Sequence, residues 1–187
     1  MENLTYLDLS SNLLTQLNVH VFSNLSCLIH LDLRYNKISF VENNVFACLS
    51  SLNNLYLNNN ELKTIESKLF VGLGNIKILR LGYNEIEYIA NNSFADMKNL
   101  TDLRLIGSNL TTLTGFNNNE SKLSSLSSSI FQGLNMLETL NLPYNKIKIL
   151  DENNFRNLNN LKFLNLMSNQ VRLPTLVVSK QIHIYLF

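Results

Sequence analysis

The sequence predicts an α/β solenoid: a right-handed curved array with a parallel β-sheet on its concave side and mostly irregular or short-helical segments on its convex side. Three observations carry this prediction. A leucine pattern recurs with a fixed period, an asparagine stands at one position of most copies, and a phenylalanine stands at another. A fixed period of about 20 to 50 residues is typical of stacked architectures, in which each unit buries its apolar face against its neighbours.

The leucine pattern L-x-x-L-x-L-x-x-N defines the strands. The interval between copies is 24 residues, except between the fifth and the sixth, where it is 37, or 24 plus an insertion of 13 at residues 114–126. The two central leucines alternate with outward residues, which is the period of a strand with one buried face. We therefore expect seven short parallel strands. The copies begin at Leu4, Leu28, Leu52, Ile76, Leu100, Leu137 and Leu161.

The asparagine follows the second strand leucine by three residues, where the chain turns inward and leaves backbone groups unpaired. A buried side-chain amide can both donate and accept, so a column of asparagines can satisfy those groups from coil to coil. The fifth copy has Ser108 instead, which is shorter, so we expect the ladder to be weakest there. The structural ladder consists of Asn12, Asn36, Asn60, Asn84, Asn145 and Asn169.

The phenylalanines form a second column, and we expect their rings to stack inside the core beneath the convex side. The short distance between the asparagine and phenylalanine columns predicts turns or irregular segments there instead of long helices. The column consists of Phe22, Phe46, Phe70, Phe94, Phe131 and Phe155.

The 24-residue length and the phenylalanine column resemble the typical class of leucine-rich repeats, which is found in ectodomains of Toll-like receptors, Slit, chaoptin and small leucine-rich proteoglycans. The resemblance covers Leu4 to about Val171. It implies a recognition array over residues 1–173, followed by a divergent C-terminal tail at 174–187. Extracellular members usually carry disulfide-bonded caps, which this sequence lacks, so the chain is expected to be a fragment of a longer ectodomain.

Charge and cysteine content limit the classes of partner and the compartments that the sequence favours. The chain has 15 basic and 14 acidic residues, so no global field favours nucleic acid or an anionic membrane. No apolar run is long enough to span a membrane. Cys27 and Cys48 both fall on the convex side, and we expect free, partly buried thiols, with a disulfide as the alternative. The protein is expected to be extracellular or a plasma-membrane ectodomain if it is part of a longer chain, and cytosolic if the chain is complete.

Six N-x-S/T sequons occur, a pattern that marks acceptor sites for N-glycosylation in secreted proteins. Asn91 and Asn119 are expected on exposed convex or inserted segments. The candidate glycosylation sites are Asn91, Asn119 and Asn24.

The outward strand residues define a candidate binding face rich in tyrosine and arginine, residue types that are enriched in interface hot spots. The alternative is a solvated face that tolerates these residues. Asp8 and Asp32 are expected to form a solvated acidic edge of the same face instead of a catalytic pair. The candidate partner-binding residues are Arg34, Tyr35, Tyr56, Arg80, Tyr83, Arg104 and Tyr144.

No motif for catalysis, metal binding or phosphate binding is present, so we expect no enzyme activity, no metal and no cofactor. The sequence predicts a non-catalytic recognition module of a receptor or adhesion ectodomain, with a protein ligand or receptor as its partner and dimerisation left open. An intracellular scaffold or adaptor is the alternative.

The tail carries one further strand pattern. Ile182, Ile184 and Leu186 alternate with His183 and Tyr185, which is typical of a strand with one apolar face. We expect residues 181–187 to fold back over the open end of the array as an added edge strand. The alternative is a disordered, aggregation-prone segment.

Overall fold

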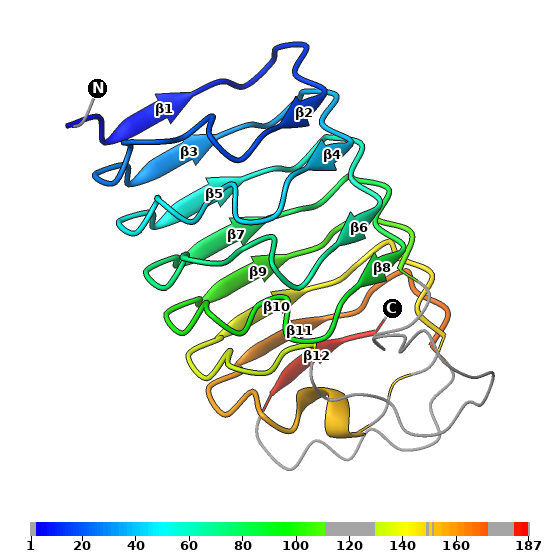
Figure 1. The fold of residues 1–187 in the computed structure, drawn as a ribbon. Coiled ribbons are helices and arrows are strands. Elements are labelled where there is room, and N and C mark those ends of the chain that lie inside the picture. Colours follow the sequence, from blue (N-terminus) through cyan, green and yellow to red (C-terminus); the bar gives the residue numbers. More distant parts are fainter. Residues whose placement is uncertain (1–2, 111–129, 149, 151, 172–181, 187) are drawn as a thin grey trace, which may run out of the picture.

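The computed structural model describes residues 3–110, 130–148, 150, 152–171 and 182–186, whose coils stack into one solenoid (Figure 1). In that part of the chain a single parallel sheet of eight strands runs along one side, in the order β1-β3-β5-β7-β9-β10-β11-β12. The strands are β1 (Tyr6–Asp8), β3 (His30–Asp32), β5 (Asn54–Tyr56), β7 (Ile78–Arg80), β9 (Asp102–Arg104), β10 (Thr139–Asn141), β11 (Phe163–Asn165) and β12 (His183–Tyr185).

Strand pairing follows the sequence period. Leu7 pairs with Leu31, 24 residues later, and the same offset holds for the next three pairs. Across the insertion, Leu103 pairs with Leu140, 37 residues later. The sheet therefore continues through the fifth and sixth coils without a change of register. The insertion itself, at 114–126, lies outside the described residues.

The convex side has almost no helix. Among the described residues the single helix is a 3-10 turn, η1 (Glu152–Phe155), so the expectation of no long helices is confirmed. Turns, irregular segments or short helices were expected there. In addition, neighbouring coils approach closely enough to form short parallel pairs, in a row apart from the large sheet (Figure 1). These pairs are β2 (Gln16–Leu17) with β4 (Phe40–Val41), and β6 (Thr64–Ile65) with β8 (Tyr88–Ile89).

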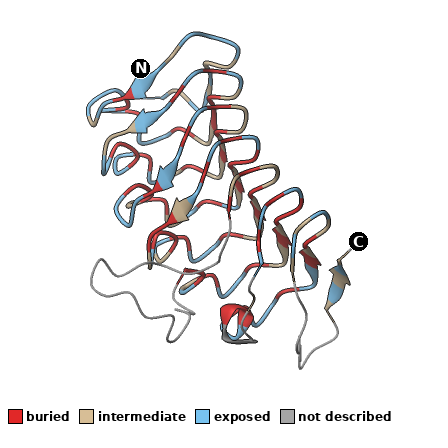
Figure 2. Ribbon diagram, turned by 90° about the vertical axis from the view of Figure 1, so that its right-hand side faces the viewer, coloured by how far each residue is buried: buried red, intermediate tan, exposed pale blue. Residues whose placement is uncertain are grey.

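The core is a continuous apolar column. Figure 2 shows buried residues at the same place in successive coils. The rings of Phe22, Phe46, Phe70 and Phe94 stack with centroids 5.9–6.2 Å apart and interplanar angles of 15–16°. Because each ring packs on the next, the coils support one another in series, as expected for a solenoid.

The asparagines link coils by hydrogen bonds to the backbone. Asn84 is buried; its Oδ1 accepts from the amide of Leu62 at 3.0 Å. Its Nδ2 donates to the carbonyls of Leu57 and Leu81, at 3.0 and 2.8 Å. The equivalent three hydrogen bonds, two to the preceding coil and one within the same coil, are made by Asn36, Asn60, Asn145 and Asn169. Asn12, in the first coil, is exposed and bonds only to carbonyls of its own coil among the described residues.

Ser108 interrupts this ladder. It is 5% exposed, and its Oγ has no hydrogen-bond partner among the described residues. The Ile86 amide, which stands where Leu62 stands one coil earlier, therefore receives no side-chain acceptor from Ser108. Ser108 also makes no hydrogen bond to the Leu81 carbonyl. In the described part of the chain, Asn84 is the one side chain that donates to this carbonyl.

The tail adds the last strand of the sheet. Residues of β12 pair in parallel with β11, Ile184 opposite Leu164, so the expectation of an added edge strand is confirmed. Ile182, Ile184 and Leu186 pack against the core and are partly buried, while His183 and Tyr185 point outward. The end of the array is thus covered by sequence that does not belong to the leucine period.

Both cysteines lie on the surface. Cys27 and Cys48 are free, as expected, but they are exposed instead of partly buried. Both occupy turn positions whose side chains point to solvent, because the neighbouring leucines and phenylalanines already fill the core. No helix in the described residues is long and apolar enough to cross a membrane.

Candidate recognition surface

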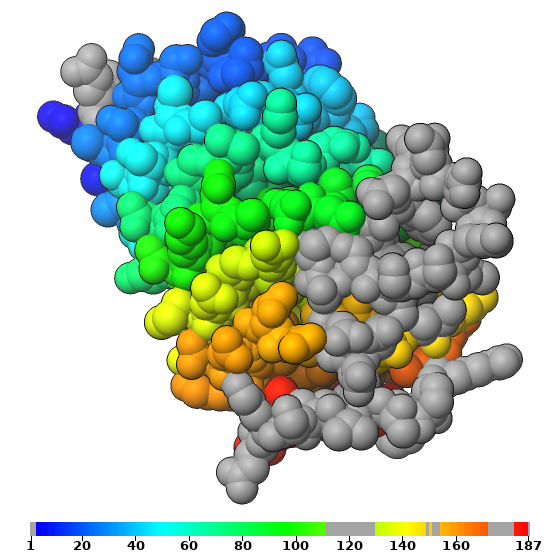
Figure 3. All heavy atoms as spheres, turned by 60° about the horizontal axis from the view of Figure 1, so that its bottom comes forward, coloured from blue at the N-terminus to red at the C-terminus, as the bar shows by residue number. Residues whose placement is uncertain are grey.

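The outward side chains of the large sheet form a continuous row across the coils. Register places Asp8, Asp32, Tyr56, Arg80 and Arg104 side by side on five consecutive strands, and this set is called the central row below. Successive parallel strands lie about 4.8 Å apart, so neighbouring side chains in the row are within contact distance. Figure 3 shows the coils as consecutive bands of the molecular surface.

Asp32 and Arg34 form an ion pair within one strand and its extension. The Arg34 Nε donates to both carboxylate oxygens of Asp32 at 2.9 Å, and Nη2 also contacts Oδ2. This carboxylate raises the pKa of the Arg34 guanidinium, chiefly through those hydrogen bonds. Asp32 is only 3% exposed, so the expectation of a solvated acidic edge at this residue is wrong. Asp8 does remain exposed, and its pKa is lowered by hydrogen bonds from Ser10.

Asp102 and Arg104 repeat the arrangement on β9. Nε of Arg104 donates to both oxygens of Asp102 at 3.0 Å, and Nη2 donates to Oδ2 at 2.7 Å. The same contacts raise the pKa of Arg104. Two of the three candidate arginines are therefore neutralised by a carboxylate two residues earlier in the chain.

Tyr56 joins the remaining candidates. The guanidinium carbon of Arg34 lies 5.4 Å from the centre of the Tyr56 ring, and that of Arg80 lies 5.0 Å from it. Contacts of this kind between a cation and an aromatic ring are attractive by about 0.5–2 kcal/mol. The structure thus brings Arg34, Tyr56 and Arg80 into one stack, named the arginine–tyrosine stack, with Arg104 on the next strand.

Arg80 differs from the other two arginines in having no carboxylate partner among the described residues. The residue two positions before Arg80 is Ile78, whereas Asp32 precedes Arg34 and Asp102 precedes Arg104 by the same two residues. Its Nε is buried and donates to no acceptor in the described part of the chain. A buried, unpaired polar group in a folded protein is uncommon and calls for a physical reason.

The candidate tyrosines outside the stack lie beyond the strands, at the turn. They are 55–60% exposed and have positive φ angles of 54–56°. A bulky residue seldom adopts this left-handed conformation, which glycine and asparagine occupy more readily. These residues are Tyr35, Tyr83 and Tyr144, and the same turn position in the other coils holds Ser11, Asn59, Gly107 and Ser168.

The alternation of large and small residues at this turn has a steric reason. The Tyr83 ring leans toward the next coil, so that a Cβ atom at Gly107 would lie 2.9 Å from its Cδ1. The ring occupies space that a side chain of the following coil would need. These tyrosines were predicted as part of the binding face, just beyond the strand columns, and they do lie there; the steric alternation with Gly, Asn and Ser was not predicted.

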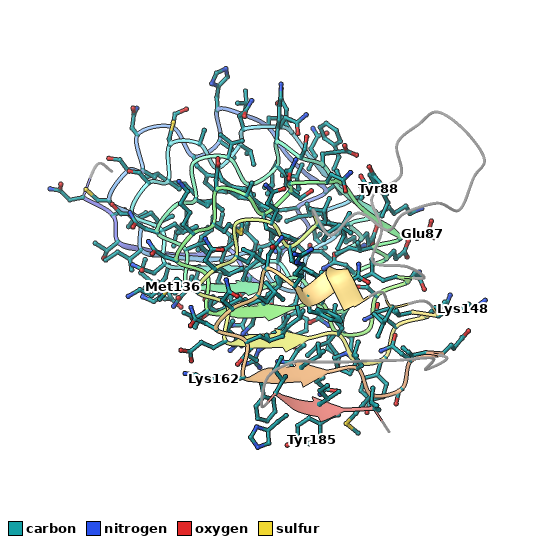
Figure 4. The ribbon with its side chains drawn as sticks, turned by 90° about the horizontal axis from the view of Figure 1, so that it is seen from below. Glu87, Tyr88, Met136, Lys148, Lys162 and Tyr185 are labelled. Carbon is teal, nitrogen blue, oxygen red and sulfur yellow. The ribbon has the colours of Figure 1, made fainter. Side chains whose placement is uncertain are left out.

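An aromatic group at the C-terminal end was not anticipated. Phe163 stacks with Tyr185 at 5.2 Å and with His183 at 6.0 Å, and Phe163 and Tyr185 are partly exposed. Figure 4 shows Tyr185 on the last strand, with Met136 and Lys162 on one side of the coils and Glu87, Tyr88 and Lys148 on the other. The period-two alternation of the tail would have placed these rings together had β12 been aligned with β11.

The glycosylation candidates have different environments. Asn24 is exposed, with a φ of 67°. Asn91 was expected on an exposed segment, but it is half-buried, with its Oδ1 buried and without a hydrogen-bond partner in the described residues. The sequon serine, Ser93, is itself buried and donates to the Ala90 and Ile65 carbonyls, because this segment turns tightly after β8. Asn119 lies outside the described residues.

No group of three or more His, Cys, Asp or Glu side chains in the described part of the chain could hold a metal ion. The described side chains of this surface offer ion pairs, cation–aromatic contacts and exposed aromatic rings.

The leucine rich repeat family model matches residues 2–62, 50–110 and 112–171, and the chain belongs to this family. Its fold is in general a scaffold for protein interaction and not for catalysis. No match was found among curated protein sequences.

Solved structures of leucine-rich repeat proteins share the fold. Toll in the Toll–Spatzle complex from Drosophila has a TM-score of 0.80 at 24% identity over 96% of this chain and 24% of its own. The APL1 leucine-rich repeat domain has a TM-score of 0.77 at 17% identity over 92% of this chain and 41% of its own. TLR13, solved with ssRNA13, has a TM-score of 0.53 at 24% identity over 89% of this chain and 29% of its own. The chain thus spans less than half the length of these proteins.

Proposed function

We propose that this chain is a recognition segment of a receptor or cell-adhesion ectodomain and that it binds a protein ligand on its concave sheet. The observation that carries the proposal is the arginine–tyrosine stack of Arg34, Tyr56 and Arg80. Such a stack holds three interface-prone side chains in fixed positions on a rigid sheet, so they lose little conformational freedom on binding. The proposed array is 1–173, with 174–187 as its divergent end.

The membership in a family of interaction scaffolds supports a protein partner, and the fold likeness to Toll supports an extracellular setting. Asn24, which is exposed, is the proposed glycosylation site that the described residues favour. An intracellular scaffold is the second candidate, favoured by the two free, exposed thiols of Cys27 and Cys48, which would be expected to survive in a reducing compartment.

Site-specific photo-cross-linking tests the binding face. A photoreactive residue in place of Asn58, just after β5 on the sheet side, should capture a partner from native cell extracts or medium, whereas one in place of Lys68 on the convex side should not. Arg80→Ala combined with Tyr56→Ala should then lower the affinity for the captured partner by 10-fold or more, about 1.4 kcal/mol, while Lys68→Ala should leave this affinity unchanged. Capture from the convex position, with the double variant unaffected, would overturn the proposed face.

Secretion distinguishes the two settings. When the chain is secreted from eukaryotic cells behind an added signal peptide, an extracellular domain should gain an enzymatically removable glycan that Asn24→Gln abolishes. Misfolding and retention of the secreted chain, together with a soluble cytosolic pool when it is expressed without the signal, would favour the scaffold.

A further inference from the structure

We propose that Arg80 is the anchor for a single carboxylate of the partner, an aspartate or glutamate side chain that completes the ion pair that this arginine lacks within its own chain. The inference rests on the proposed function, because it names the chemistry of the group that binds the same sheet. It goes beyond that function because it names the chemical group of the partner that Arg80 binds.

The comparison among the three arginines gives the first argument. Arg34 and Arg104 each have a carboxylate two residues earlier, with Nε within 2.9–3.0 Å of both of its oxygens. Arg80 has Ile78 at that position and forms no ion pair with the described residues. A carboxylate thus stands two residues before Arg34 and Arg104 but not before Arg80, so among the described residues Arg80 has no ion-pair partner in its own chain.

The orientation of the side chain gives the second argument. The guanidinium carbon of Arg80 lies 5.0 Å from the centre of the Tyr56 ring, so contact with the ring restrains the group. Its Nε is buried and unpaired, while the residue as a whole is half-buried. A planar group with five donors recognises a carboxylate by two parallel hydrogen bonds, and one that is already oriented loses little freedom on doing so.

Charge on the face favours one carboxylate over a polyanion. Around the central row, three carboxylates (Asp8, Asp32 and Asp102) face three arginines, so the face carries no net charge. The one carboxylate left without an arginine, Asp8, is three strands from Arg80, about 14 Å. That exceeds the screening length of about 8–10 Å, so it does not neutralise Arg80. Binding to nucleic acid draws most of its affinity from many phosphate contacts, which this balanced face does not offer.

The test observes the arginine directly. In the whole chain labelled with nitrogen-15, the Nε–Hε resonances of Arg34, Arg80 and Arg104 are followed while blocked glutamate (N-acetyl-glutamate α-amide) is added. Blocked glutamine, which has the same shape without the charge, is the matched control at equal ionic strength. We expect a saturable shift of the Arg80 resonance with glutamate that is at least threefold larger than the shifts of the two paired arginines. We expect no such shift with glutamine.

Variants separate the anchor from a general effect of charge. Arg80→Gln should abolish the shift of the Tyr56 ring protons on addition of glutamate, whereas Lys68→Gln, which removes one positive charge on the convex side, should preserve it. Equal shifts at all three arginines, or an unchanged Tyr56 response in Arg80→Gln, would overturn the proposal. A single-stranded RNA oligomer that shifts Arg80 when glutamate does not would overturn it in favour of phosphate recognition.

The two proposals fail in different ways. If the Asn58 cross-link captures a partner but Arg80→Gln binds it as tightly as the parent chain, the recognition face stands and the carboxylate anchor is wrong. If glutamate binds at Arg80 but partners are captured only from the convex position, the anion site stands and the proposed binding face is wrong.

Discussion

Removing the side chain of Asn84 should destabilise the array more than removing that of a ladder asparagine whose two neighbouring coils both carry an asparagine, such as Asn60. Each internal ladder asparagine serves one amide and two carbonyls, and each carbonyl is normally shared with the asparagine of an adjacent coil. The Leu57 carbonyl, for example, accepts from both Asn60 and Asn84 at 3.0 Å. The loss of one asparagine therefore leaves such a carbonyl with its other partner.

The Leu81 carbonyl is an exception, because Ser108 stands where its second donor would be, and the Leu105 carbonyl, which accepts from Asn145, lacks its second donor for the same reason. In Asn84→Ala, both the Leu81 carbonyl and the Leu62 amide lose their side-chain partner. Each buried group left unpaired costs about 1–3 kcal/mol, so the expected loss of stability is about 2–6 kcal/mol. In Asn60→Ala only the Ile38 amide is orphaned, and the expected loss is about 1–3 kcal/mol.

Urea unfolding measures the difference in stability between these variants, provided that the unfolding free energy depends on urea concentration with the same slope in each. Ser108→Ala is the internal control and should change little, since its Oγ has no partner among the described residues. Ser108→Asn should restore the missing side-chain hydrogen bonds. In that background the loss of stability caused by Asn84→Ala should fall to that caused by Asn60→Ala. Equal midpoints for Asn84→Ala and Ser108→Ala would refute the ladder argument. An unchanged cost of Asn84→Ala in the Ser108→Asn background would refute the sharing of carbonyls.

Three further outcomes are expected. Deleting residues 180–187 removes β12 and should lower the melting temperature and increase aggregation; improved solubility at unchanged stability would contradict its role as a cover. Gly72→Ala should destabilise the protein by at least about 1–2 kcal/mol, because φ is +90° and the new Cβ would lie 2.7 Å from a backbone oxygen, whereas Gly74→Ala meets nothing closer than 3.8 Å and should be nearly neutral in thermal unfolding. Asp32→Ala should cost about 1.5–3 kcal/mol in chemical unfolding through its buried charged hydrogen bonds, and the exposed Asp8→Ala much less; equal effects would argue against the buried pair.

Apart from β12, the features of the fold that could be predicted are those that recur in the sequence. Leucine, asparagine and phenylalanine at a 24-residue interval define the strands and the core, because stacking places equivalent residues in contact. The pairs β2–β4 and β6–β8 could not be predicted in this way, since a two-residue bridge has too few positions to show a period. Asn91 was misjudged because its burial depends on how tightly the segment after β8 turns.

The composition of the candidate binding face was predictable, but the contacts within it were not. Register alone places Tyr56 beside Arg80. Whether an arginine pairs with an aspartate two residues earlier depends on both side chains turning toward each other along the strand, which no period reports. Comparing Asp32–Arg34 and Asp102–Arg104 with Ile78–Arg80 in the sequence would have been enough to single out Arg80.

The turn tyrosines give the molecule a second, longer period. Tyr35 and Tyr83 are 48 residues apart, and Tyr83 and Tyr144 are 61 apart, or 48 plus the 13 of the insertion. Losing the coil of Asn59 or of Gly107 would bring two tyrosines onto neighbouring turns about 5 Å apart, where the second would stand in space like that which the Tyr83 ring takes over Gly107. The smallest piece that can be gained or lost while this alternation is kept is therefore a pair of coils.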